Sequence, residues 1–335
     1  MPQKIVFEDF LNIHTHLPII DVRSPGEYDQ GHIPYAVNIP LFTNEERAKV
    51  GTCYKQQGKE TAVKLGLEIV GPKLKDFVLE AERIAPDRQV IIHCWRGGMR
   101  SSSFAWLLET AGFKQVYTID KGYKGFRNWS LEQFEQTYDF RILGGYTGSG
   151  KTAILHMMAD AGAITIDLEK LAHHKGSAFG GLGEAPQPTQ EQFENNLAIQ
   201  LYTKRHNPIW IEDESRCIGS IHLPNNIYRQ KVEANLYLVM THIEERIKTL
   251  VDNYGAFSKE ALAVAIMKIE KKLGPQHAKV ALEALEQGDL SSVARMTLGY
   301  YDKAYDFLMN KRNQEKVFKF IPSQNLVHQL IDTHE

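Results

Sequence analysis

Residues 91 to 101 read Ile-Ile-His-Cys-Trp-Arg-Gly-Gly-Met-Arg-Ser, and they set one thiol, Cys94, between an apolar segment and a helical one. The apolar run Val90 to Ile92 predicts a buried strand, and residues 101–108 predict a helix. A cysteine at the turn between them would receive backbone N–H groups and the positive end of a helix, which favours thiolate over thiol. The spacing therefore predicts a nucleophilic cysteine.

The residues that follow Cys94 suit the binding of an oxyanion. Arginine guanidinium groups match the geometry of a phosphate, or of a sulfur- or selenium-bearing phosphate, and a Gly-Gly pair lets the backbone curl. A buried core thiol is the alternative for Cys94, but such a thiol needs neither two arginines nor a Gly-Gly turn beside it. The predicted anion loop comprises Trp95, Arg96, Gly97, Gly98, Met99 and Arg100.

A second loop, residues 144–152, satisfies the pattern Gly-x4-Gly-Lys-Thr. It follows the strand-like residues 140–143 and opens an amphipathic stretch, 153–161, which is the context that this motif requires. The glycines let successive N–H groups face a phosphate, Lys151 adds a positive charge, and the Thr152 hydroxyl can bind Mg²⁺. The predicted diphosphate-binding residues are Gly145, Tyr146, Thr147, Gly148, Ser149, Gly150, Lys151 and Thr152.

Acidic residues follow two further apolar segments, residues 163–166 and 209–211. Ligand-binding groups in an open parallel sheet gather at the carboxyl ends of the strands, so both segments are expected to face the crevice of the lysine loop. Any one of these acids alone is more often a solvated loop carboxylate. The candidate metal-linked acids are Asp167, Glu212 and Asp213, with Glu169 two residues beyond the first.

Composition limits the class of protein. The chain has 335 residues, enough for two domains, and 43% apolar with 24% charged residues is ordinary for a globular protein. A net charge of −2 gives no general affinity for nucleic acid, so any RNA must meet a local basic patch. Three cysteines indicate a reducing compartment, and the absence of a signal-peptide pattern or a membrane span predicts a cytoplasmic protein.

Other residues with chemical potential receive plainer interpretations. Cys53 and Cys217 lack the surroundings of Cys94 and are expected to be structural thiols. His173 and His174 have no third metal ligand at a useful spacing. The glycine-rich segment 173–181 around them is expected to be a mobile loop over the phosphate crevice.

The order of predicted elements indicates an α/β protein. Strands at 19–23, 36–39, 90–92 and 115–119 alternate with helical segments, the longest at about 43–85, which predicts a parallel sheet covered by helices on both faces. The predicted division is an N-terminal domain, 1–130, a linker, 131–139, and a second α/β domain, 140–335. Residues 243–310 of the second domain have an almost wholly helical pattern.

The first half resembles the rhodanese family over residues 5–130. The resemblance rests on Asp-Val-Arg-Ser-Pro-Gly-Glu-Tyr at 21–28, on Gly-His-Ile-Pro-Tyr-Ala-Val-Asn-Ile-Pro at 31–40, and on the cysteine loop. It implies transfer of sulfur or selenium through a cysteine persulfide or selenosulfide, with Cys94 as the matching residue. One difference is that Cys94 to Arg100 spans seven residues where sulfurtransferase loops usually have six, which resembles the larger loop of cysteine phosphatases.

The fusion of such a domain to a P-loop NTPase-like domain resembles the tRNA 2-selenouridine synthase family over nearly the whole chain. Supporting segments lie at 45–52, 122–124, 167–173 and 212–216. The resemblance implies that geranyl diphosphate alkylates the sulfur of wobble 2-thiouridine in tRNA, and that selenium from selenophosphate then replaces the geranylthio group. No tightly bound cofactor is expected, and Mg²⁺ would be bound through Thr152. The expected tRNA contacts are the basic residues Lys121, Lys124 and Arg127.

Two other functions are compatible with these loops. A cysteine phosphatase fused to a nucleotide kinase fits both motifs, although no aspartate lies inside the cysteine loop to serve as the general acid. A regulatory RNA-binding ATPase with a vestigial Cys94 is the second alternative. Phosphate release from aryl phosphates would favour the first, and rapid labelling of Cys94 well below pH 8 would count against the second.

Overall fold

The computed structural model describes residues 2–13 and 15–332, which form two compact units. Unit 1 runs through residue 132 and includes the short stretch 194–196, and unit 2 holds the other described residues. Each unit has its own five-stranded sheet and its own hydrophobic core. Among the described residues, no helix combines the length and the apolar character needed to cross a bilayer.

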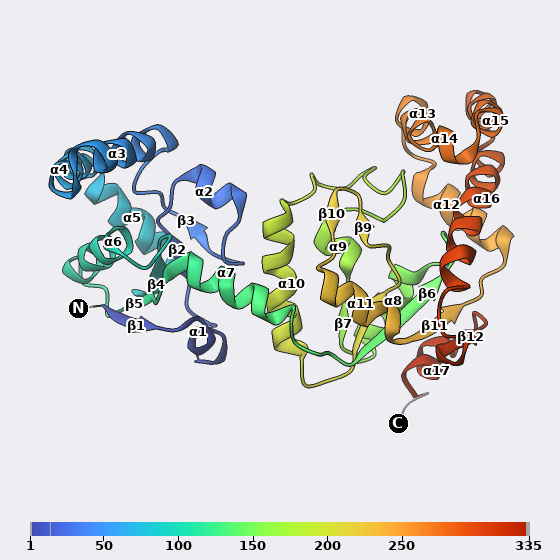
Figure 1. Ribbon diagram of the computed structural model, residues 1–335, viewed down its shortest axis with the longest axis horizontal. Coiled ribbons are helices and arrows are strands. Elements are labelled where there is room, and N and C mark those ends of the chain that lie inside the picture. Colours follow the sequence, from blue (N-terminus) through green and yellow to red (C-terminus); the bar gives the residue numbers. More distant parts are fainter. Residues whose placement is uncertain (1, 14, 333–335) are drawn as a thin grey trace. The chain divides into compact units, whose positions relative to one another are not determined.

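The sheet of unit 1 is entirely parallel, with the strand order β1-β5-β4-β2-β3. The strand that leads into the cysteine loop, β4, therefore lies at its centre (Figure 1). The strands are β1 (Gln3–Ile5), β2 (Ile19–Asp21), β3 (Val37–Asn38), β4 (Gln89–His93) and β5 (Gln115–Ile119).

Helices cover both faces of this sheet, as predicted. Alternate residues of a strand point to opposite faces, and Val90 and Ile92 of β4 belong to a core that includes Phe104. On the other face, the Phe7 ring lies 4.6 Å from that of Phe126 and 4.8 Å from that of Trp129. The helices are α1 (Phe7–Ile13), α2 (Pro25–Gln30), α3 (Asn44–Gln57), α4 (Lys59–Val70), η1 (Gly71–Lys73), α5 (Leu74–Ile84), α6 (Met99–Thr110) and α7 (Gly122–Gln133).

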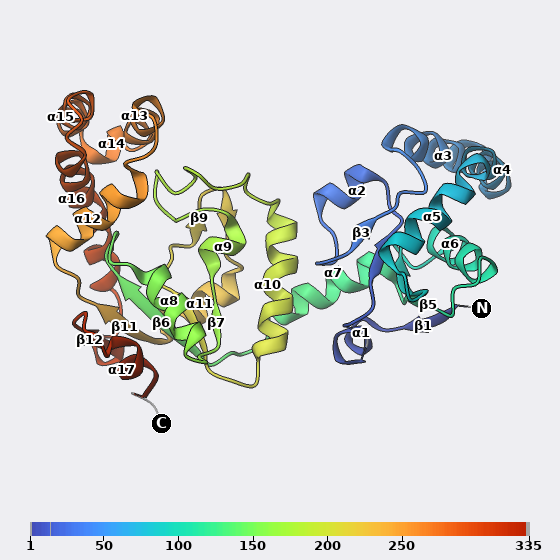
Figure 2. The same ribbon diagram turned by 180° about the vertical axis from the view of Figure 1, so that it is seen from behind.

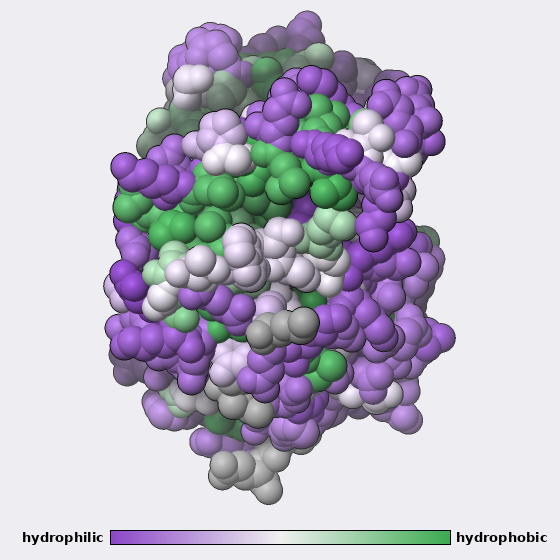
Figure 3. Space-filling view, turned by 90° about the vertical axis from the view of Figure 1, so that its left-hand side faces the viewer, coloured by the Kyte–Doolittle hydropathy of each residue, from purple (hydrophilic) through white to green (hydrophobic). Residues whose placement is uncertain are grey.

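The long helical region predicted at 43–85 consists of several helices. Thr43 starts α3, where its hydroxyl accepts the N–H of Glu46 while the Glu46 carboxylate accepts the N–H of Thr43. Gly58, at φ +87°, ends α3 and starts α4. Figure 3 shows apolar side chains gathered on one face of unit 1. Leu67 of α4 and Trp106 of α6 are large apolar side chains that are more than half exposed.

Unit 2 is built on a second parallel sheet, with the order β12-β11-β6-β8-β7. Its central strand, β6, leads into the lysine loop (Figure 2). The strands are β6 (Phe140–Gly145), β7 (Thr165–Ile166), β8 (Ile209–Glu212), β11 (Asn235–Val239) and β12 (Val317–Phe320), with a separate antiparallel pair, β9 (Cys217–Ile218) and β10 (Ile221–His222).

The core on one face of this sheet joins strands to helices that are distant in sequence. Leu143 of β6 and Tyr237 of β11 pack with Leu155 of α8 and with Leu330 of α17. The helices of unit 2 are α8 (Lys151–Asp160), α9 (Leu168–Ala172), α10 (Gln190–Lys204), α11 (Asn225–Glu233), α12 (Ile243–Tyr254), α13 (Lys259–Lys268), α14 (Glu270–Leu273), α15 (Pro275–Glu286), α16 (Leu290–Met309), η2 (Gln314–Lys316) and α17 (Leu326–Asp332).

The structure confirms the α/β class with two parallel sheets, and it adds elements that the sequence did not indicate. Strands β1, β11 and β12 were not predicted, and α7 continues through Gln133, beyond the start of the segment expected to be a linker. Cys53 is buried, as expected. The prediction of a buried structural thiol is wrong for Cys217, because it lies exposed on β9, a strand of a small two-stranded sheet.

Candidate functional site

Cys94 lies directly after the central strand of unit 1, at the turn into α6. Its Sγ is 3.2 Å from Ser101 Oγ and 3.9 Å from the carbonyl oxygen of Gly98. Only 3% of the residue is exposed, and Ser101 is fully buried. The thiol therefore lies at the base of the loop, within hydrogen-bonding distance of the buried Ser101 hydroxyl. Ser101 was not among the predicted site residues, although it is the last residue of the segment that contains them.

Two glycines fix the path of the cysteine loop. Gly97 and Gly122 have φ values of +63° and +55°, which favour glycine. A Cβ on Gly122 would lie 2.2 Å from the Cys94 carbonyl oxygen and 2.5 Å from the Gly97 nitrogen. The N–H of Tyr123 donates to the Cys94 carbonyl at 2.9 Å. The start of α7 is therefore in backbone contact with the cysteine loop, and neither glycine can carry a side chain.

The two arginines of the loop have different surroundings. The Arg100 guanidinium donates to both carboxylate oxygens of Glu27, at 2.8 and 3.3 Å. Although burial opposes ionisation, the Arg100 contacts lower the pKa of Glu27 to about 2. Arg96 is exposed, as are Trp95 and Met99. The two arginines predicted to bind an anion therefore differ. Arg100 is hydrogen-bonded to Glu27 of α2, and Arg96 is exposed to solvent.

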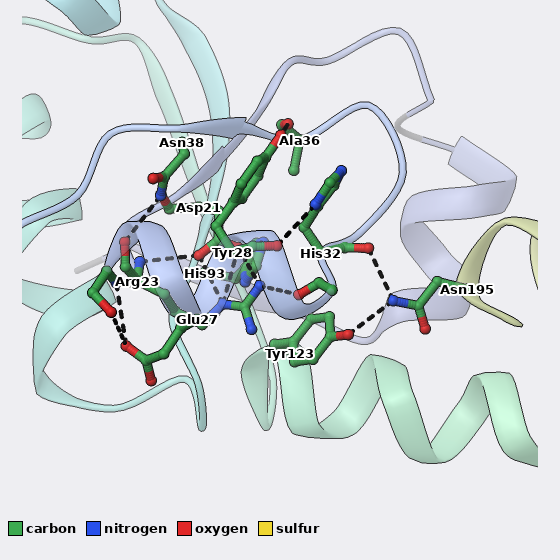
Figure 4. Close-up of polar contacts among 12 residues, drawn as sticks. Asp21, Arg23, Glu27, Tyr28, His32, Ala36, Asn38, His93, Tyr123 and Asn195 are labelled. Carbon is green, nitrogen blue, oxygen red and sulfur yellow. Dashed lines mark hydrogen bonds and ion pairs between the residues drawn. The ribbon is translucent and has the colours of Figure 1, made fainter. Parts of the chain in front are cut away.

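A buried ion pair lies at the end of β2, beside the end of β4 (Figure 4). Asp21 and Arg23 have no exposed surface, and Arg23 Nη2 lies 2.6 Å from Asp21 Oδ2. The guanidinium also lies 3.8 Å from the centre of the Tyr123 ring, and the Tyr123 hydroxyl accepts a hydrogen bond from Asn195. Burial lowers the pKa of the adjacent His93 to about 4, so this imidazole is neutral at pH 7. These contacts give a structural reason for the Asp-Val-Arg segment.

The basic residues expected to contact tRNA flank the cysteine loop. Lys121 and Lys124 are exposed, and the Lys124 N–H donates to the Trp95 carbonyl at 2.9 Å. Arg127 is paired with Glu194, and its Nη1 donates to Asn195 Oδ1 at 3.2 Å. Contact with tRNA stays a prediction for all three, and the two lysines are the more accessible.

The lysine loop of unit 2 turns at two glycines. Gly148 and Gly150 have φ values of +80° and +79°, which favour glycine. Lys151 Nζ donates to the Gly145 carbonyl at 3.0 Å, which holds the ammonium group over the loop. The buried Ser149 hydroxyl has no hydrogen-bond partner among the described residues. An unpaired buried hydroxyl is expected where a ligand supplies the missing partner.

Residues from α12 and α16 hold the loop in place. Arg246 Nε donates to the Thr147 carbonyl at 2.9 Å, and its terminal nitrogens pair with Asp302 at 2.5 and 3.0 Å. The Tyr146 hydroxyl donates to Asp306 at 2.6 Å. These anchors could not be predicted from local sequence patterns, because they lie about 100 to 160 residues beyond the loop. The loop is therefore supported by the helical part of unit 2.

A hydroxyl and a carboxylate meet at the start of α8. Thr152 Oγ1 donates to Glu169 Oε2 at 2.7 Å. Burial raises the pKa of Glu169 to about 7, and the nearby Glu214 and Asp167 add to the effect. Mg²⁺ is usually bound by a small number of protein oxygens together with substrate phosphates, so Thr152 and Glu169 fit that ion. The described residues contain no group of three or more His, Cys, Asp or Glu side chains arranged around a metal.

The predicted acids at the strand ends have separate roles. Glu212 is fully buried, its Oε2 accepts the Leu168 N–H at 3.0 Å, and burial raises its pKa well above the usual value. Asp167 caps α9 by accepting the Lys170 N–H at 2.7 Å, and it also lies 2.6 Å from His156 Nε2. Glu212 and Asp167 therefore lie near Glu169, as the parallel-sheet argument expects.

Asp213 is instead surrounded by two buried cationic side chains and a tyrosine hydroxyl. Its Oδ1 accepts from Lys231 at 2.6 Å and from Arg312 at 2.8 Å, and its Oδ2 accepts from the Tyr305 hydroxyl at 3.0 Å. The Tyr305 hydroxyl in turn accepts the Gly145 N–H at 3.2 Å. Both oxygens of Asp213 are engaged, so the geometry favours a structural role over the metal-linked role expected for it.

Comparison with known proteins agrees with this two-part architecture. Family models match a rhodanese-like domain over residues 7–128 and the AAA domain of tRNA 2-selenouridine synthase over residues 138–335. A tRNA 2-selenouridine synthase from Sulfurovum sp. is 35% identical over 95% of this chain and 95% of its own length. Another from Shewanella denitrificans is 36% identical over 90% of this chain and 91% of its own. The chain therefore belongs to the tRNA 2-selenouridine synthase family.

Proposed function

We propose that this protein converts wobble 2-thiouridine in tRNA into 2-selenouridine in two steps. In the first step, geranyl diphosphate bound at the lysine loop alkylates the sulfur. In the second, selenium from selenophosphate replaces the geranylthio group at the cysteine loop. The observation that carries the proposal is the presence of two separately built anion loops in a chain of this family, one with a buried thiol and one with a lysine and a threonine. The tRNA substrate is consistent with action in the cytoplasm.

The lysine loop suits the first step. The sulfur of 2-thiouridine attacks C1 of the geranyl group, the C1–O bond breaks, and diphosphate leaves with additional negative charge on its oxygen. Backbone N–H groups and Lys151 would stabilise that charge in the transition state. Mg²⁺ at Thr152 and Glu169 would supply further charge neutralisation when bound. No tightly bound cofactor is required.

The cysteine loop suits the second step. Selenophosphate is a phosphate-like anion, and the turn after β4 combines the start of α6 with exposed Arg96. The selenium atom attacks C2 of the geranylated base, the C2–S bond breaks and geranylthiol leaves, and water then cleaves the Se–P bond to release phosphate. Cys94 lies at the base of this turn beside Ser101, where the selenium end of the donor would meet it. The tRNA backbone would contact Lys121 and Lys124, which flank the same loop and are exposed.

The geometry does not favour a cysteine phosphatase. Such an enzyme needs a protonated acid for the leaving oxygen. Glu27, the carboxylate that contacts the cysteine loop through Arg100, has a pKa of about 2 and is ionised at neutral pH. It therefore cannot act as a general acid there. Release of phosphate from an aryl phosphate by this protein, lost in Cys94→Ser, would nevertheless support that alternative.

Nucleoside analysis of tRNA tests the proposal directly. Incubation of 2-thiouridine-containing tRNA with the protein, geranyl diphosphate and selenophosphate should yield 2-selenouridine by mass spectrometry. Omission of selenophosphate should leave S-geranyl-2-thiouridine, and omission of geranyl diphosphate should leave 2-thiouridine. Formation of 2-selenouridine without geranyl diphosphate would contradict the order of the steps.

Two cysteine variants separate the chemistry from general damage. Cys94→Ala should abolish selenium incorporation, because it removes the thiol from a loop whose backbone is held by other contacts. Cys53→Ala is the matched control, since Cys53 is also a buried thiol of unit 1 but lies on α3. Equal losses in both variants would indicate a folding defect instead of a catalytic role.

A further inference from the structure

Unit 2 contains a mainly apolar cavity beside the lysine loop. Residues of α16 at positions 290, 293, 294, 297 and 301 form one wall, and this spacing places them on one face of the helix. The cavity has a volume of about 50 Å³ and opens to solvent. Its other lining residues are Thr147, Ser177, Phe179, Leu250, Val251, Tyr254, Gly255 and Leu262.

The cavity adjoins the lysine loop through two residues. Thr147 belongs to the lysine loop and also lines the cavity. Leu250 lines it as well, and a Cβ on Gly148 would lie 3.1 Å from Leu250 Cγ. A ligand whose anionic end occupies the loop would therefore have its other end beside an apolar chamber.

Three polar side chains of the cavity wall already have hydrogen-bond partners. The Thr297 hydroxyl donates to carbonyl groups one turn earlier in α16, at 3.0 Å. The Tyr301 hydroxyl accepts the Ala178 N–H at 2.9 Å, and Ser177 Oγ accepts the Phe179 N–H at 3.2 Å. A nucleobase needs hydrogen-bonding groups that are free to read its edge, whereas a hydrocarbon needs only apolar contact. The wall therefore favours a hydrocarbon over the base of a nucleotide.

We propose that this cavity binds the hydrocarbon chain of the prenyl diphosphate, so that the lysine loop binds the diphosphate and the helical part of unit 2 selects the chain. The inference rests on the proposed function and goes beyond it by assigning the chain-binding site. Segment 173–181, expected to be a loop over the phosphate crevice, contributes Ser177 and Phe179 to the wall.

Calorimetric binding to the full chain tests the assignment without turnover. Burial of four or so CH₂ groups strengthens binding roughly 100-fold. The protein should therefore bind geranyl S-thiolodiphosphate, a stable analogue, about 100-fold more tightly than inorganic pyrophosphate. Ala294→Leu, which fills the cavity, should weaken analogue binding at least about tenfold and leave pyrophosphate binding within about twofold. Ala304→Leu is the matched control, because Ala304 is an exposed alanine of the same helix.

Each outcome separates the cavity from the reaction. Equal affinity of the wild-type protein for the analogue and for pyrophosphate would overturn the cavity assignment, and so would equal losses in Ala294→Leu and Ala304→Leu. Tight, chain-dependent binding without geranylation of tRNA would overturn the proposed function and leave the cavity assignment supported. If Ala294→Leu does not fold, Val293→Ala widens the same wall, and it should shift the preference toward a farnesyl analogue. An unchanged chain-length preference would refute the assignment.

Discussion

Replacement of Lys151 by alanine is the sharpest test of the lysine loop. Lys151 Nζ already lies over the loop, 3.0 Å from the Gly145 carbonyl oxygen. A unit charge about 4 Å from a diphosphate oxygen contributes about 4 kcal/mol at an effective dielectric constant of about 20. Loss of one donor from an oxyanion site typically costs about 2.7–4 kcal/mol, or roughly 10²–10³-fold in rate. We therefore expect Lys151→Ala to lower kcat/KM for geranylation by roughly 10²–10³-fold.

The assay is the initial rate of S-geranyl-2-thiouridine formation in tRNA at low geranyl diphosphate concentration. Lys170→Ala is a suitable control, because Lys170 is an exposed lysine of the neighbouring helix α9. Lys151 makes a single hydrogen bond that water can replace, so thermal stability should change by no more than about 0.5 kcal/mol. A geranylation rate for Lys151→Ala within twofold of the Lys170→Ala rate would refute the role of the lysine loop in diphosphate binding.

Three further predictions concern the two loops and their acids. Cys94→Ala should accumulate S-geranyl-2-thiouridine with 2-selenouridine below detection by mass spectrometry, and the absence of both products would indicate one composite site. Glu27→Gln should lower the free energy of unfolding at pH 7 by about 1–3 kcal/mol, because Arg100 loses its charged partner. The pKa of Glu27 falls from 4.5 to about 2 on folding. The difference in unfolding free energy between wild type and Glu27→Gln, measured by denaturant titration, should therefore shrink as the pH falls from 4.5 to 2. An undiminished difference at pH 2 would contradict the ion-pair account. Folding raises the pKa of Glu169 from 4.5 to about 7. As the pH rises from 4.5 to 7, the wild type should therefore lose thermal stability relative to Glu169→Gln. A stability difference that does not change with pH would argue against a buried carboxyl group with a raised pKa.

Local sequence patterns predicted the fold class and the position of both loops. The strand before Cys94 and the strand before Gly145 are short apolar runs followed by glycines, and both were found as central strands of parallel sheets. Such patterns are visible because strand, turn and helix preferences act over a few neighbouring residues. Ligand-binding roles for the loop residues stay predictions.

These local patterns could not predict contacts between residues that are far apart in the sequence. Asp213 follows a buried strand and therefore resembles a metal-binding acid, yet its partners Lys231 and Arg312 lie 18 and 99 residues later. Arg100 was predicted as an anion-binding residue, and its carboxylate partner Glu27 lies 73 residues earlier. The apolar cavity of unit 2 could not be predicted for the same reason, because its wall combines the loop, segment 173–181, α12, α13 and α16. No short stretch of sequence contains enough of any of these contacts.

The Tyr305 hydroxyl bridge limits how far the lysine loop can be moved to another protein. It joins Gly145, the first glycine of the Gly-x4-Gly-Lys-Thr motif, to Asp213, and Asp213 is itself held by Lys231 and Arg312. A graft of residues 144–152 alone would leave the Gly145 N–H without its acceptor. A portable version must therefore carry the C-terminal half of α16 and the strand end at β8, so the transplantable module is most of unit 2 and not a nine-residue motif.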